Sequence, residues 1–177
     1  MRLFIAVVRP EPFAPDRLRS FLKYLQASKQ VVRFSDFPGN FYSASESLAK
    51  TGGLLRLLFN VETAPDSQRP LIVETRQDGS TYALLLDFGA VASLVDFPAS
   101  PAMVDLLVAA ARMLSAEYAV ITAGHAFKIV PSPEADNPIA LWVGAQLSRS
   151  NDAVPGMTLV QEQWDGAKLL LRTEVSR

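Results

Sequence analysis

Two clear hydrophobic patterns lie at the start of the chain. Residues 3–8 are apolar at every position, and a strand that is apolar on both faces is typical of the centre of a sheet. Further along, Leu18, Phe21, Leu22 and Leu25 recur at the helical spacing i, i+3, i+4 and i+7. Because polar residues occupy the opposite face, this spacing predicts an amphipathic helix of about 12 residues, capped by Asp16.

The segment from residue 31 to residue 59 has a hydrophobic pattern that fits more than one secondary structure. Residues 31–37 alternate between apolar and polar, as a short strand does. Ser45 is a candidate cap for a helix over residues 46–50, which Gly52-Gly53 interrupts, and residues 54–59 are expected to resume it. We therefore expect either two short helices or one kinked helix here.

Turn signals organise the rest of the chain. Asp78-Gly79 is a strong two-residue hairpin signal, and Ser100-Pro101 is typical of a helix start. The expected elements are a polar loop at residues 65–70, strands at residues 71–76, 82–88, 118–122 and 139–147, an apolar helix after residue 100, and a terminal hairpin over residues 157–174.

These patterns sum to about three helices and seven strands. Because hairpin signals dominate the second half, we expect an α+β fold with an antiparallel or mixed sheet and the helices packed mainly on one face. A length of 177 residues is typical of one domain, so residues 1–177 are predicted to form a single domain.

Candidate chemistry is sparse in this sequence. The chain has no cysteine and one histidine, His125, whereas transition-metal sites usually take several such ligands and a histidine base needs a nucleophile beside it. Thr51-Gly52-Gly53 lacks the spacing of a phosphate-binding loop, and a break in the helix is the simpler interpretation. We therefore expect no catalytic residue, no cofactor and no metal, and we predict that the protein is not an enzyme.

Charge is distributed unevenly along the chain. Residues 1–60 hold nine Lys/Arg and four Asp/Glu, whereas residues 61–136 hold four and ten. A nucleic-acid binder presents one strong basic face, so direct contact with nucleic acid is not expected. The acidic middle suits a basic protein partner, and the alternative is that both regions are solvated faces that balance each other.

The apolar runs are short. The first one is closed by Arg9 and Pro10 and is too short for a typical signal peptide. No run reaches the roughly 18 apolar residues of a membrane helix. We expect a cytoplasmic protein without a membrane partner, and the absence of cysteine fits that compartment.

The order of these pieces resembles the immunity proteins of bacterial polymorphic-toxin and type VI secretion systems, and most of all the immunity protein 52 family. The resemblance spans most of the chain. The segments that carry it are Asn40-Phe41-Tyr42-Ser43-Ala44-Ser45-Glu46-Ser47-Leu48-Ala49, the Asp78-Gly79 hairpin, the apolar helix that leads into Ala116-Glu117-Tyr118-Ala119-Val120-Ile121-Thr122, the strand Trp142-Val143-Gly144-Ala145-Gln146-Leu147-Ser148-Arg149, the turn Val154-Pro155-Gly156, and Asp165-Gly166-Ala167-Lys168-Leu169-Leu170.

The resemblance implies a stoichiometric inhibitor that binds and neutralises a cognate secreted antibacterial toxin. A nuclease that acts in the cytoplasm is the implied target, since the family is paired with restriction-endonuclease-like toxins. The phosphate-binding cleft of a nuclease is basic, so an acidic surface of the inhibitor would compete with nucleic acid for it. The expected contact residues are Asp66, Asp87, Asp96, Glu134 and Asp136, with Phe97 as an apolar anchor.

Three alternatives stay open at this point. A small-molecule-binding or regulatory α+β domain would show a pocket lined by Tyr82, Trp142 and Tyr118. A hydrolase or transferase would need two acids, or a serine with His125, in one cleft. A structural subunit of a larger assembly is the third. Trp142 is expected in the core, and Trp164 either packs on its hairpin or anchors a partner.

Overall fold

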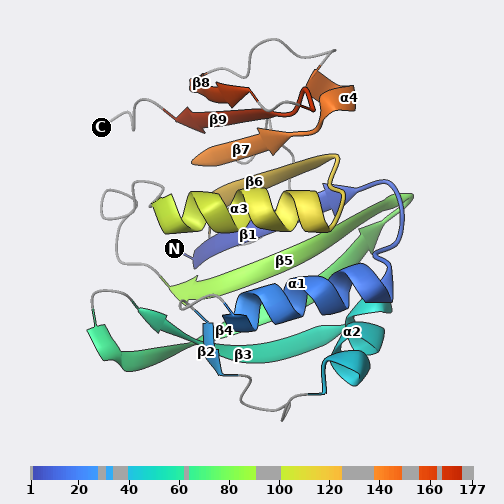
Figure 1. Ribbon diagram of the computed structural model, residues 1–177, viewed down its shortest axis with the longest axis vertical. Helices are drawn as coiled ribbons and strands as arrows, with labels where there is room; N and C mark the ends of the chain where they lie inside the picture. The colour runs from blue at the N-terminus through green and yellow to red at the C-terminus, as the bar shows by residue number, and fades with distance from the viewer. Residues whose placement is uncertain are drawn as a thin grey trace.

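Nine strands of the described chain form one antiparallel sheet (Figure 1). The computed structural model describes residues 2–27, 31–33, 40–61, 64–90, 101–124, 138–148, 156–162 and 165–172. In spatial order the strands are β2 (Val31–Arg33), β3 (Leu54–Val61), β4 (Ala64–Asp78), β5 (Thr81–Ala90), β1 (Arg2–Arg9), β6 (Tyr118–Gly124), β7 (Ala140–Val143), β9 (Lys168–Arg172) and β8 (Met157–Glu162). Together with the helices, this arrangement confirms the α+β class.

Three helices cover one face of the sheet, which agrees with the predicted packing. They are α1 (Pro15–Ala27), α2 (Phe41–Ala49) and α3 (Pro101–Met113), and their buried side chains join those of the sheet in one core cluster. The single turn α4 (Ala145–Ser148) contributes Leu147 to a second cluster on the opposite face. No helix among the described residues is both long and apolar enough to cross a bilayer.

β1 is the central strand, as its sequence predicts. It stands fifth of the nine strands of the described sheet. Ile5 and Val7 face the helices, whereas Ala6 and Val8 face the second cluster, and none of the four is exposed to solvent. A strand between two covered faces has no solvated side, and this is why its sequence shows no polar alternation.

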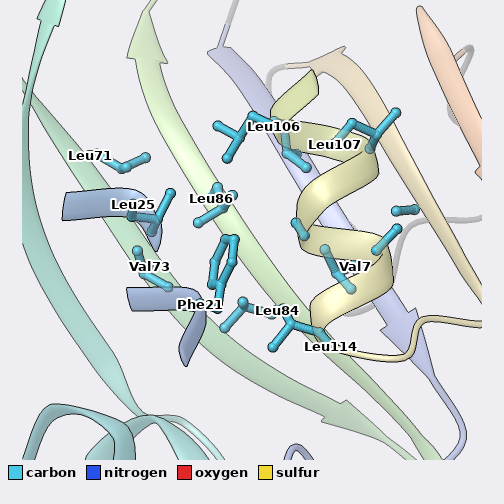
Figure 2. Close-up of a cluster of buried hydrophobic side chains, with 14 of the residues drawn as sticks. Val7, Phe21, Leu25, Leu71, Val73, Leu84, Leu86, Leu106, Leu107 and Leu114 are labelled. Carbon is cyan, nitrogen blue, oxygen red and sulfur yellow. The ribbon is translucent and has the colours of Figure 1, made fainter. Parts of the chain in front are cut away.

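The amphipathic helix forms where the spacing predicts it. Leu18, Phe21, Leu22 and Leu25 are all fully buried, and Figure 2 shows Phe21 among the core side chains Leu25, Val73, Leu84 and Leu86. The helix begins at Pro15, and the Leu18 amide donates to the Ala14 carbonyl oxygen at 3.1 Å. Asp16 therefore lies in the first turn and is not the cap, which corrects the prediction.

The second helix begins earlier than predicted, and Ser45 is not its cap. The cap is Asn40, whose side-chain oxygen accepts a hydrogen bond from the Ser43 amide at 3.2 Å. Ser45 is buried within the helix, where its hydroxyl donates to the Tyr42 carbonyl oxygen at 2.8 Å. Both are good cap residues, so the choice between them depends on how the rest of the helix packs.

Residues 54–59 form strand β3, and the prediction that they resume a helix is wrong. Leu55 and Leu57 are buried while Leu54 and Arg56 are exposed, which is the two-residue period of a strand. The apolar residues also fit a helical spacing, and pairing with β4 decides between the two. β4 itself begins at Ala64, so residues 65–70 belong to a strand and not to the predicted loop.

The hairpins agree with their turn signals, apart from small shifts. Asp78 pairs with Thr81, so the two turn residues are Gly79 and Ser80, and Gly79 has a φ of 57°. β8 and β9 form the predicted terminal hairpin. Two strands are shorter than expected: β7 ends at Val143, before α4, and β2 ends at Arg33, while residues 34–39 lie outside the described part.

Candidate partner-binding end of the sheet

The two ends of the sheet differ in how the strands are connected. We call the end at which β1 begins the Arg2 end, where Arg2 pairs with Ala90 of β5 and with Gly124 of β6. We call the other end the Arg9 end, where Arg9 pairs with Tyr82. Because neighbouring strands are antiparallel, each hairpin lies at one end, whereas the connections that carry α1 and α3 and the β7–β8 connection join strand ends at opposite ends of the sheet.

Hydrogen bonds tie three strands together at the Arg9 end, where the connection of residues 34–53 between β2 and β3 also begins and ends. The Glu117 amide donates to the Val8 carbonyl oxygen at 2.8 Å, and the Gly144 amide donates to the Glu117 carbonyl oxygen at 2.9 Å. The β4–β5 turn at Gly79 lies at the same end. These bonds tie the ends of β1, β6 and β7 to one another, so these three strand ends are held in a fixed arrangement.

Arg9 is a buried cation at the Arg9 end of the sheet. Its Nη1 donates to the Leu114 carbonyl oxygen at 2.9 Å, just past the last turn of α3, and its Nη2 donates to Glu11 Oε2 at 2.7 Å. The guanidinium also lies 5.9 Å from the centre of the Phe13 ring. A carbonyl at a helix C-terminus lacks an intrahelical donor, so Arg9 holds β1 and α3 together and has a structural role.

The long connections begin and end at the Arg2 end. Residues 91–100 follow Ala90 of β5, and residues 125–137 separate Gly124 of β6 from Pro138, just before β7. α3 also begins toward this end, because Leu114 beyond its last residue bonds to Arg9 and a helix of 13 residues is about 20 Å long. Binding residues are often found on connections that a rigid scaffold holds in place.

Asp87 is the one predicted contact residue whose side chain the structure describes. Its carboxylate pairs with Arg2 at 2.5 Å and accepts a hydrogen bond from the Gly89 amide at 2.8 Å. The Asp87 side chain is 14% exposed and that of Arg2 is 47% exposed. Asp87 thus lies at the Arg2 end, but much of its charge is neutralised within the protein.

The structure does not describe the side chains of the other five predicted contact residues. Asp66 belongs to the first part of β4, which extends toward the Arg2 end because Ile72 already pairs with Asp87; its side chain is not described. Asp96 and Phe97, and likewise Glu134 and Asp136, lie outside the described residues, within the two long connections. The structure therefore places the Asp87 side chain and the backbone of Asp66 toward the Arg2 end, and the other four predicted residues are not described.

The pocket expected for a small-molecule-binding domain does not form from the three aromatic residues proposed. Trp142 and Tyr82 belong to the helix-covered core, whereas Tyr118 packs against the second cluster on the opposite face. Trp142 is 5% exposed, which confirms its prediction as a core residue. Trp164 and His125 lie outside the described residues.

The two-glycine segment has its amide groups engaged within the fold. The Gly52 amide donates to the Thr75 carbonyl oxygen at 3.0 Å, and the Gly53 amide donates to the Lys50 carbonyl oxygen at 2.9 Å. The Thr75 hydroxyl adds a bond to the Lys50 carbonyl oxygen at 2.8 Å. A phosphate-binding loop needs such amides to point at the ligand, so this segment is a structural turn.

Surface features that the sequence analysis missed include several exposed apolar side chains. Among the described residues, the large exposed hydrophobics are Tyr42 (61%), Leu54 (49%), Leu159 (48%) and Val160 (57%). The Tyr42 ring lies beneath the Arg19 guanidinium at 4.8 Å on the α1–α2 surface. No sequence signal separates these residues from core residues, because exposure depends on which strands and helices cover them.

The comparisons with known proteins identify no relatives by sequence. No family model matches the chain, and no curated protein matches it. The resemblance to the immunity protein 52 family is thus without support from a family model. One similar solved structure is the Pseudomonas aeruginosa T6SS protein PA0821, with 8% identity and a TM-score of 0.48 over 96% of this chain and 68% of that chain. A likeness this distant carries no argument about function.

Proposed function

We propose that the protein is an immunity protein that binds a cognate secreted antibacterial toxin and neutralises it by stoichiometric inhibition. The observation that supports this proposal is the topology of the Arg2 end. Two long connections, residues 91–100 and 125–137, start there from a sheet whose central strands β1, β6 and β7 are tied together by hydrogen bonds at the other end. Such an arrangement of connections on a fixed scaffold suits the recognition of a protein partner.

The charge at the Arg2 end favours a basic target. Residues 62–69, 91–100 and 125–137 hold five carboxylates, Arg69 and one lysine, so their formal net charge is −3 (five negative, two positive), and beside them Arg2 and Asp87 form an ion pair. The carboxylates are Glu62, Asp66, Asp96, Glu134 and Asp136, and the lysine is Lys128. An acidic surface of this kind would compete with nucleic acid for the basic cleft of a nuclease and would speed association. We propose a nuclease that acts in the cytoplasm as the target.

A double charge reversal, Asp96→Lys with Glu134→Lys, is expected to weaken this complex. The tagged protein, purified from its host, should co-purify with a toxin at near one-to-one stoichiometry and inhibit its nuclease activity. At low salt the double variant should associate at least about 10-fold more slowly, because rim charges act mainly on the association rate. Surface plasmon resonance at two ionic strengths would measure this change.

The matched control is Asp78→Lys, which reverses an exposed carboxylate at the Arg9 end. It should bind like the wild type, and all variants should keep the wild-type melting temperature. Equal loss of binding in the control, or a double variant that binds normally, would contradict the proposed surface. A co-purified protein without toxicity in the host would contradict the proposed function.

A further inference from the structure

The outermost strand on the β9 side of the sheet is unusually exposed. β8 follows β9 in the strand order, and within the described chain no strand pairs with its outer edge. Its residues from Thr158 to Glu162 are all exposed, so solvent reaches both faces of this part of the strand. Leu159 and Val160 lie next to each other here and are 48% and 57% exposed.

The backbone of Leu159 points away from the sheet. The Arg172 amide donates to the Ile139 carbonyl oxygen at 3.0 Å, so Arg172 turns its backbone toward β7. The N–H and C=O groups of successive residues in a strand point to alternate sides. Leu170 lies two residues before Arg172, so its N–H and C=O groups also point toward β7. Leu159 is paired with Leu170, so it cannot form a ladder bond with β9, and its N–H and C=O groups face outward. A six-residue strand with apolar side chains and outward backbone groups is a template for another strand.

We propose that β8 pairs with β8 of a second copy of the chain, antiparallel and about a two-fold axis at Leu159. In this register Leu159 lies opposite Leu159 of the partner subunit, and Thr158 lies opposite Val160 of the partner subunit. Leu159 of one strand thereby covers Leu159 of the other, and Val160 covers the methyl group of Thr158. Cross-strand apolar pairs of this kind stabilise a sheet.

The charge of the strand favours this antiparallel self-pairing. The only charged residue of β8 is Glu162, and in its own subunit it pairs across the ladder with Lys168. Two-fold pairing at Leu159 places the two Glu162 side chains six residues apart, roughly 20 Å, which exceeds the screening length of about 8 Å. Parallel pairing in register would instead bring them to about 5 Å. No charge of the strand therefore opposes the proposed contact.

The two edges of the sheet differ in a way that limits the assembly to two copies. Within the described residues β2, the other edge strand, spans three residues, and a very short edge is a poor template. An isologous contact between two β8 strands uses the same surface on both subunits and closes on itself. A β-bulge between Leu159 and Gln161 restricts the regular pairing to the residues around Leu159. We therefore expect a contact below the roughly 1,200 Å² of stable interfaces and a weak dimer, with a dissociation constant on the order of 100 µM.

Sedimentation velocity of the full chain over a concentration series tests this proposal. The wild type should shift from monomer to dimer between about 10 µM and about 1 mM. Leu159→Lys should weaken the dimer at least about 10-fold, because it places two like charges opposite each other at the two-fold axis. Leu54→Lys is the matched control: Leu54 is a strand leucine of nearly equal exposure, 49%, on β3, and this variant should dimerise like the wild type.

Several outcomes would overturn the proposal. A wild type that stays monomeric over the whole series would do so, as would equal weakening by Leu159→Lys and Leu54→Lys, which would indicate general surface attraction. A monomer whose β8 amides become protected only in the toxin complex would also overturn self-pairing and would assign this edge to the toxin. Unchanged melting temperatures would show that both variants are folded. The dimer contact does not depend on the proposed immunity function.

Discussion

Gly53→Ala is expected to destabilise the fold by about 3 kcal/mol, because the added methyl group has no space. A Cβ at this position would lie 2.2 Å from the Ser47 carbonyl oxygen and 2.8 Å from Leu48 Cα. Both are backbone atoms of α2, so no side-chain rotation relieves the overlap. α2 would have to move away from β3, and the bonds to Thr75 would be strained. Urea unfolding followed by circular dichroism measures the loss.

The neighbouring Gly52 provides the control for this prediction. Gly52 has a φ of 78°, and a Cβ there would meet nothing within 4 Å. Gly52→Ala should therefore cost only the backbone strain of the left-handed conformation, roughly 1 kcal/mol. Equal stability losses in the two variants would show that close approach to α2 is not what requires glycine at position 53.

Phe21→Ala is expected to cost about 4 kcal/mol, in the range of large-to-small substitutions at fully buried aromatic positions. Phe21 is not exposed at all, and it packs in the cluster that joins α1, α3 and the sheet (Figure 2). Its removal leaves a cavity between the helices and β5, which the surrounding strands are too constrained to fill. Chemical denaturation should show a lower midpoint with an unchanged slope.

Tyr42→Ala is the control for the loss of an aromatic ring. Tyr42 is 61% exposed and contacts Arg19 on the surface. A cation–π contact at an exposed site contributes about 0.5–1 kcal/mol, so this variant should lose no more than that. If Tyr42→Ala were as destabilising as Phe21→Ala, the core would not be centred where the structure places it.

The parts of the fold that could be predicted from the sequence are those with strong local patterns. The all-apolar residues of β1 and the helical spacing from Leu18 to Leu25 each admit one interpretation, and both predictions are confirmed. Gly79 supplies the positive φ of its turn, so the hairpin that contains it was also predictable. In these segments the local preference and the packing agree.

The failures lie where distant residues decide the structure. Residues 54–59 fit both a strand and a helix, and their conformation is set by pairing with β4, whose residue Thr75 also holds the turn at Gly53. The helix over residues 46–50 was misplaced because its cap, Asn40, lies five residues before the expected cap, Ser45. Local propensity cannot settle either case, since tertiary contacts override it.

The candidate site was predictable in composition but not in arrangement. The excess of carboxylates in residues 61–136 is visible in the sequence. The proposed grouping of some of them at the Arg2 end is not, because it depends on β1 lying between β5 and β6 and on the direction of every strand. The neutralisation of Asp87 likewise requires Arg2, which is 85 residues away in the sequence. Strand order thus turns a compositional bias into a candidate surface.

The most direct test of the central claim, that the Arg2 end binds the toxin, is hydrogen–deuterium exchange of the protein alone and in complex with the toxin that it captures. In the complex, slower exchange is expected at residues 91–100 and 125–137 and at the neighbouring strand ends, Gly124 and Ile139. Exchange at the Gly79 turn of the Arg9 end should be unchanged. Protection centred on the Arg9 end, with unchanged exchange at both long connections, would contradict the account.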